Sequence, residues 1–180
     1  MQLQRDVLPA FENAGVKLFV VGIGSVESGR EFSEALRPPF PLEMLLVDES
    51  ELTDAYAAAG TRNSARGEDG KQVFEGVESM WSTATTTAID ARGKQDLDAV
   101  TGNLFNKGPY KPLMPKGRSL FDQRAIEKTL VQGGSFVFRG RETLVEHYDE
   151  SSGAHLPIQT LLDAALPKVA ALQQPSIDSR

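Results

Sequence analysis

The sequence predicts an α/β domain that ends in an antiparallel hairpin and a helix. Residues 2–60 alternate helix-forming and strand-forming stretches, which is the pattern of a fold with parallel strands. Residues 135–149 form two strand-like runs around Gly140-Arg141, and a glycine at the first central turn position supplies the positive φ that a tight hairpin needs. A helix-forming stretch follows from Pro157. The 180 residues are enough for one domain with a substantial core.

The first expected helix covers residues 2–14. Its apolar residues recur at helical spacing: Leu3, Val7 and Phe11. Pro9 is expected to bend this helix, and Gly15 is expected to end it in the left-handed conformation. No Ser, Thr, Asp or Asn cap precedes Leu3, so we expect the helix to start upstream of that residue.

Two short buried strands are expected next, at Val16–Ile23 and Leu42–Val47. Ser25 is the expected N-cap of the helix between them, and Glu27 is favourably placed in its first turn. The inner face of this helix is expected to consist of three residues: Phe32, Ala35 and Leu36. A third helix is expected to open in the acidic stretch Asp48–Asp54 and to run through Ala59.

Residues 61–118 are expected to be an insertion, because they are weakly periodic and rich in loop-forming residues. Residues 61–80 predict a surface loop, and one or two helices are expected around Asp96–Phe105. A helix over Ser119–Gln132 follows the insertion. Residues 173–180 predict a flexible tail, so the single domain covers residues 1–172.

The hairpin strands are expected at Ser135–Arg139 and Glu142–Asp149. The unbroken apolar run Phe136–Phe138 predicts a strand covered on both faces. The preceding doublet, Gly133 and Gly134, indicates a place where another backbone or a ligand comes close. A hairpin packed under a C-terminal helix is the second half of a thioredoxin-type fold, a three-layer α/β sandwich.

Two strings of residues carry a family resemblance. Residues 132–140, Gln-Gly-Gly-x-Phe-Val-Phe-x-Gly, and residues 147–155, His-Tyr-Asp-x-x-x-Gly-Ala-His, resemble the end of peroxiredoxin-like proteins of the AhpC/TSA antioxidant group. The resemblance covers residues 2–60 and 109–166, and it is to the plant, algal and bacterial branch. It implies a thiol peroxidase or oxidoreductase lineage and a chloroplast location. In that family a cysteine at the start of the first helix attacks peroxide, because the helix terminus stabilises its thiolate.

The chain contains no cysteine. We therefore expect no catalytic residue, no cofactor site and no metal site, and a chain that is redox-inactive as it stands. The resemblance also implies a first central strand between Val16–Ile23 and Ser135–Arg139, which this sequence lacks. Two interpretations follow: a truncated piece of a longer redox protein, or a structural or docking subunit of a larger complex. In both, the missing N-terminal segment or a protein partner completes the sheet.

Composition and charge exclude other partners. A net charge of −6 argues against nucleic acid, and no run of about 18 apolar residues predicts a membrane span. The expected location, apart from the chloroplast that the resemblance implies, is soluble and intracellular. Gly22-x-Gly24 has Glu27 where a dinucleotide loop needs its third glycine, which disfavours a nucleotide site.

Two further groups are candidates for binding. The aromatic and basic residues Tyr110, Lys111 and Lys116 indicate an arm that docks an anionic partner, although a solvated loop explains them more simply. His147 and His155 are metal-ligand types close to Asp149 and Glu150. The favoured interpretation of the two histidines is that they are exposed polar positions.

Overall fold

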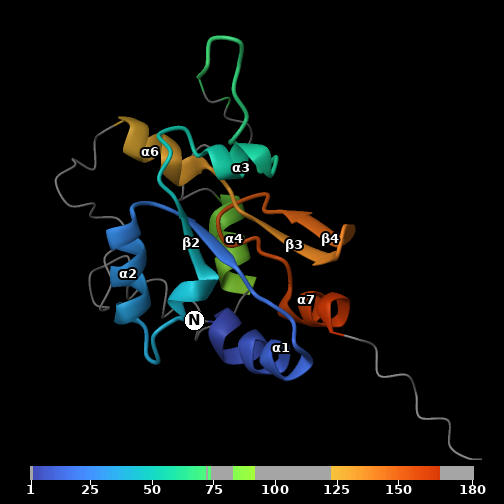
Figure 1. The fold of residues 1–180 in the computed structure, drawn as a ribbon. Helices are drawn as coiled ribbons and strands as arrows, with labels where there is room; N and C mark the ends of the chain where they lie inside the picture. The colour runs from blue at the N-terminus through green and yellow to red at the C-terminus, as the bar shows by residue number, and fades with distance from the viewer. Residues whose placement is uncertain (1, 72, 74–82, 92–122, 167–180) are drawn as a thin grey trace, which may run out of the picture.

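The computed structural model describes residues 2–71, 73, 83–91 and 123–166 (Figure 1). Several predictions lie outside these residues: the helices around residues 96–105, the tail at residues 173–180 and most of the expected insertion. Among the described helices, none is long and apolar enough to cross a lipid bilayer.

The strands form two separate two-stranded sheets. β1 (Val20–Ile23) pairs in parallel with β2 (Leu45–Asp48), with Val20 opposite Leu45 and Ile23 opposite Asp48. β3 (Gly134–Arg139) and β4 (Glu142–Tyr148) form the predicted antiparallel hairpin, and Gly140 has the expected positive φ of 61°. Parallel strands in the first half and a hairpin in the second confirm the α/β prediction.

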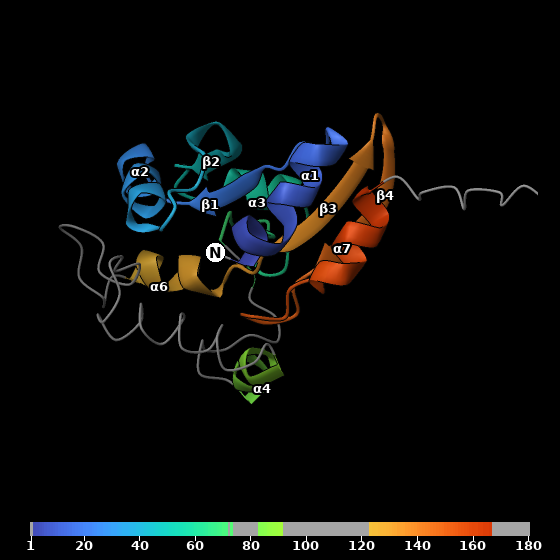
Figure 2. The ribbon, with the colours of Figure 1, turned by 90° about the horizontal axis from the view of Figure 1, so that it is seen from below.

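The strands follow one another in the order β2, β1, β3, β4 in both ribbon views (Figures 1 and 2). Gly24 donates its N–H to Asp48 O (3.2 Å), so its backbone groups point toward β2. Successive residues of a strand direct their backbone N–H and C=O groups to opposite sides, so those of Val21 and Ile23 point away from β2. Asp149 donates its N–H to Gly133 O (3.0 Å), so the backbone groups of Gly133 point toward β4. By the same alternation, the backbone groups of Gly134 and Phe136 point away from β4. In the described part of the chain no strand pairs with either of these two edges, which we call the open edges.

The first helix has a break that differs from the predicted bend. A π-helix, η1 (Leu3–Val7), is followed by α1 (Leu8–Ala14), in which Pro9 lies in the first turn. Proline is well tolerated there because the first amides of a helix have no intrahelical acceptor. Gly15 ends α1 with φ 68° and ψ 21°, which confirms the predicted left-handed end.

The main core lies between this first helix, the hairpin and α7 (Ile158–Ala165), the predicted C-terminal helix. Its buried residues come from all three elements: Val7, Phe11, Val137 and Leu161. Leu18, ahead of β1, packs against the same cluster. One face of the hairpin is therefore covered by helices.

The other face of the hairpin corrects the prediction of a strand covered on both sides. Phe138 is 63% exposed, and its ring stacks on Phe136 at a centroid distance of 6.4 Å. Tyr148 meets Phe136 edge to face at 5.5 Å. An unbroken apolar run was a misleading signal here, because the aromatic rings cover one another instead of lying under a helix.

The second half of the parallel unit is close to prediction. Ser25 caps α2 (Val26–Ala35), because its side chain accepts a hydrogen bond from Ser28 N (3.2 Å). In the first turn, the pKa of Glu27 is lowered by a hydrogen bond from its own backbone N–H and by one from the Ser25 side chain. Leu36 is buried, as predicted. The strand expected from Leu42 begins three residues later, because Pro41 leads into a short 3-10 helix, η2 (Leu42–Met44).

Three more helices complete the described structure: α3 (Asp54–Ala58), α4 (Thr83–Ala91) and α6 (Gln123–Leu130). α6 falls within the helix predicted at residues 119–132, whereas α4 precedes the expected helical segment. The predicted surface loop after α3 is wrong at its start, since three of its polar residues are buried: Thr61, Asn63 and Ser64. They are buried because each uses hydrogen bonds to backbone carbonyls.

Candidate functional site

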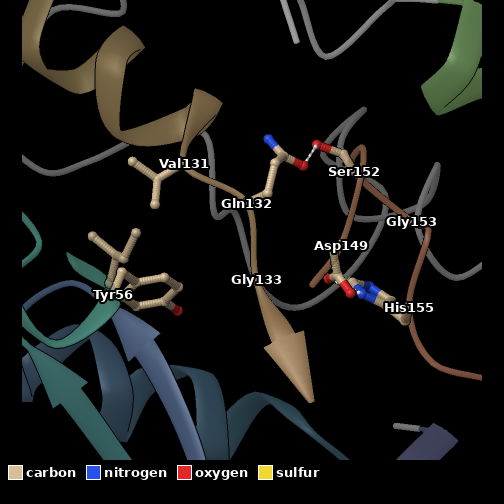
Figure 3. A pocket seen from close by; sticks show the side chains of 9 residues that line it. Tyr56, Val131, Gln132, Gly133, Asp149, Ser152, Gly153 and His155 are labelled. Carbon is tan, nitrogen blue, oxygen red and sulfur yellow. Dashed lines mark hydrogen bonds and ion pairs between the residues drawn. The ribbon is translucent and has the colours of Figure 1, made fainter. Parts of the chain in front are cut away.

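A pocket of about 340 Å³ lies where β1 ends and β3 is about to begin (Figure 3). The carboxyl ends of parallel strands are a common position for ligand sites in α/β folds. The pocket is lined by residues from β1, α3, the segment before β3 and the loop after β4: Ile23, Tyr56, Val131, Gln132, Gly133, Asp149, Ser152, Gly153 and His155.

Tyr56, on α3, forms one wall of the pocket. Its hydroxyl donates to Val21 O at 2.8 Å, and this carbonyl belongs to the open edge of β1. Burial raises the pKa of Tyr56, and the nearby charges of Asp48 and Asp149 raise it further. The hydroxyl therefore keeps its proton and serves as a donor.

Asp48, the last residue of β2, holds α3 in place. Its carboxylate accepts from Ser50 N (3.0 Å), from the Ser50 hydroxyl and from Ala55 N (2.8 Å) in the first turn of α3. Burial raises the pKa of Asp48, but the hydrogen bonds from Ser50 and Ala55 and the charge of Lys128 outweigh it, so the pKa is lowered overall. The carboxylate acts as the cap that Thr53, with φ 54° and no capping hydrogen bond, does not supply.

The segment before β3 is fixed by its contacts with the buried loop after α3. Asn63 Nδ2 donates to Leu130 O at 2.8 Å, and Gln132 N donates to Arg62 O at 3.0 Å. The Gln132 side chain is bonded at both ends, by donating Nε2 to Leu130 O (2.8 Å) and accepting from Ser152 Oγ (3.3 Å). The segment at this wall of the pocket is thus held by one backbone hydrogen bond and by hydrogen bonds of the Asn63, Gln132 and Ser152 side chains.

Asp149 is the most constrained charged group of the site. Its side chain is 4% exposed, and its Oδ2 lies 2.6 Å from His155 Nδ1. His147 Nε2 lies 3.4 Å from Asp149 Oδ1 but 3.0 Å from Ala154 O. A carbonyl only accepts, so the Nε2 hydrogen of His147 is directed to Ala154, and Asp149 Oδ1 has no hydrogen-bond partner.

This arrangement does not amount to a metal centre. Within the described residues, no group of three or more His, Cys, Asp or Glu side chains is arranged to hold a metal ion. What the Asp149–His155 pair can do is hold a proton at His155 Nδ1, since the carboxylate oxygen accepts from that nitrogen. His155 is more exposed than its partner and forms the outer wall of the pocket.

The sequence-predicted site residues have different positions. Gly133 lines the pocket, where an added Cβ would lie 3.0 Å from Asp149 Oδ2. Gly134, the next residue, does not line it, and its Cβ would lie 2.8 Å from His147 O. Tyr110, Lys111 and Lys116 lie outside the described residues.

The sequence interpretation missed the role of three residues in this site: Tyr56, Gln132 and Ser152. Tyr56 gave no signal, because a single tyrosine in a short helix is unremarkable without its neighbours. In the sequence, Asp149 and His155 are residues of metal-ligand type, although the favoured interpretation of the histidine is an exposed polar position. The string His-Tyr-Asp-x-x-x-Gly-Ala-His carried the signal, since it places both residues on one tight loop.

A parallel strand pair, a hairpin and a C-terminal helix, with a pocket at the strand ends, make this a mixed α/β protein, which is consistent with a thioredoxin-like family. The sequence matches the AhpC/TSA antioxidant enzyme family over residues 2–151, and the chain belongs to this family. No curated protein and no solved structure matches the sequence.

Proposed function

We propose that this chain is a strand-accepting, thiol-free scaffold of the antioxidant lineage. The observation that carries the proposal is the pair of open edges on β1 and β3, which lie between the two half-sheets. A strand placed between them would run beside β1 and β3 and would join the two sheets into one. The strand would come from a segment of a longer redox protein that lies outside these 180 residues.

The chemistry of the open edges supports strand addition. Val21 is 43% exposed and Phe138 is 63% exposed, so each strand that carries an open edge also presents an apolar side chain to solvent. An apolar edge with free backbone groups is a template for another strand. Main-chain hydrogen bonds then supply the affinity, as in β-augmentation.

The absence of cysteine from the sequence supports the redox-inactive part of the proposal. A thiol peroxidase needs a thiolate nucleophile, and no side chain of this chain supplies one. Any redox step in the complete assembly would therefore use a cysteine that lies outside these residues.

The experiment compares two variants at one edge residue. Proline at Val21 removes the N–H that points away from β2, and threonine keeps it; neither touches the N–H groups that pair with β2. Because free edges associate, sedimentation of the unchanged chain should show self-association. Val21→Pro should reduce this association, and Val21→Thr should not.

Hydrogen exchange gives the second readout. The Val21 and Phe136 amides should exchange faster than the Gly22 and Val137 amides in the dilute chain, and should become protected when the strand is present. A soluble monomer in which Val21 and Phe136 are already protected would mean that the sheet closes by itself, and would refute the proposal.

A strand from a separate protein is the alternative source, and it would make the chain a docking subunit. Extending the chain with its upstream coding sequence distinguishes the two, because only the longer protein would then protect the Val21 amide without a partner. The resemblance to the plant, algal and bacterial branch adds a chloroplast location to the proposal. A fluorescent fusion of the full-length coding sequence tests the location.

A further inference from the structure

Asp149 Oδ1 is a buried carboxylate oxygen that lacks a donor. Its neighbour Oδ2 is occupied by His155 at 2.6 Å, and the His147 Nε2 hydrogen is directed at Ala154 O. A buried charged oxygen without a hydrogen bond is unfavourable, because it has given up water without replacement. The Asp149 side chain lines the pocket, so a donor that enters the pocket approaches this carboxylate while His155 stays on Oδ2.

The pocket wall has a negative potential. Asp149 is the one carboxylate among its lining residues, and in the described part of the chain no lysine or arginine lines it. The pKa of Tyr56, which forms the α3 wall, is raised mainly by burial and further by the negative charges of Asp48 and Asp149. A low-dielectric pocket with this potential favours a positively charged ligand group.

We propose that the pocket binds a primary ammonium group, with Asp149 Oδ1 as its counter-ion. A guanidinium pairs best with both oxygens of a carboxylate, and here His155 already occupies one of them. An ammonium is a compact charge with three donors, so one free oxygen is enough to bind it.

The rest of the pocket fits an aliphatic stem behind the ammonium. Ile23, Val131 and the Tyr56 ring supply apolar surface, and the volume of about 340 Å³ accommodates a chain of several methylenes. A lysine side chain of a bound peptide and a free aliphatic amine share this chemistry. The inference concerns the pocket alone and does not depend on a strand between β1 and β3.

The test is an amide-shift titration of the unchanged chain with three matched probes. Nα-acetyl-lysine methylamide should shift the Gly133 and Gly153 amides saturably. The norleucine analogue, which has the same stem without the ammonium, should bind at least about tenfold more weakly, since hydrogen bonds to charged groups have this effect. The arginine analogue should also bind more weakly. Equal binding of lysine and norleucine analogues overturns the proposal.

Two variants locate the charge. Asp149→Asn should weaken lysine-probe binding by about tenfold or more, whereas Glu150→Gln, which removes an exposed charge one residue away, should leave it unchanged. Unchanged binding to a folded Asp149→Asn variant overturns the proposal. If that variant does not fold, the comparison of lysine with norleucine on the unchanged chain decides.

Titration with butylamine distinguishes the two possible ligands, a free aliphatic amine and the lysine side chain of a bound peptide. Binding as tight as that of the lysine probe assigns the pocket to free amines, and tighter binding of the lysine probe assigns it to a peptide side chain. Failure of the ammonium proposal would appear as unshifted Gly133 and Gly153 amides. Failure of the strand-accepting function would appear in the hydrogen exchange of the Val21 and Phe136 amides, so the two failures are distinguishable.

Discussion

Replacing Asp48 with alanine removes the cap of α3 and tests how the Tyr56 wall of the pocket is supported. The carboxylate accepts two backbone N–H bonds, from Ser50 at 3.0 Å and Ala55 at 2.8 Å, besides one from the Ser50 hydroxyl. Hydrogen bonds to charged groups contribute about 1.5–3 kcal/mol each, and water replaces part of this at a helix start. We expect the free energy of unfolding to fall by about 2–4 kcal/mol.

The assay is urea unfolding of the dilute chain followed by far-UV circular dichroism. Glu68→Ala is the matched control, because Glu68 is an exposed acid beyond the same helix, and it should change the unfolding free energy by less than about 0.5 kcal/mol. A loss below about 1 kcal/mol for Asp48→Ala would refute the capping role.

The same residue gives a pH dependence. The folded-state pKa of Asp48 lies below its ordinary value of 3.8, because the capping hydrogen bonds outweigh the opposing effect of burial. Its ionised form therefore stabilises the fold above that ordinary value, and this contribution is lost as pH falls through the lower folded-state pKa. The stability difference between the unchanged chain and Asp48→Asn should thus be constant from about pH 5 to 7 and shrink below about pH 4. A difference that grows on acidification would contradict this sign.

Three other outcomes are expected. Gly134→Ala should lower the free energy of unfolding by about 1–3 kcal/mol, since its Cβ would lie 2.8 Å from His147 O and 3.0 Å from the Phe136 ring. Gly22→Ala is the control and should not be destabilising, because its Cβ would have nothing within 4 Å. Equal effects of the two variants in urea unfolding would contradict this. The metal-free chain should consume no hydrogen peroxide above the buffer rate with thioredoxin or glutathione as reductant, because it has no thiol, and measurable turnover would contradict this. Tyr56→Phe should speed hydrogen exchange at the Gly24 amide, which donates to Asp48 O, because Val21 O loses its 2.8 Å hydrogen bond and the end of β1 loosens; unchanged exchange would contradict this.

Local signals predicted the elements where one residue decides the geometry. Ser25 and Gly15 were recognised as helix ends, and Gly140 as the hairpin turn, because capping and positive φ are properties of single positions. The strand predicted from Leu42 was placed too early, because its apolar residues do not show that Pro41 caps the short helix η2 and so delays β2. The break between η1 and α1 was also missed, because a proline in a first turn looks the same in sequence as one that bends a helix.

Predictions that depend on tertiary neighbours were less successful. The buried residues Asn63 and Ser64 were assigned to a surface loop because they are polar, and their carbonyl partners are set by the fold. Phe138 was assigned to a core because it is apolar. In both cases the residue type predicts only the average burial of such a side chain, whereas the burial observed in this protein depends on the groups that it contacts.

Tyr56 connects the two parts of the molecule for which functions are proposed. Its ring lines the pocket, while its hydroxyl donates to Val21 O, a backbone group on the open edge of β1. A strand added at this edge would bring its own N–H to the same carbonyl, and would compete with Tyr56 for it. The oxygen of a hydroxyl released in this way could accept a hydrogen bond from an ammonium group in the pocket, which has only donors. Completion of the sheet and recognition in the pocket would then be coupled through one hydrogen bond.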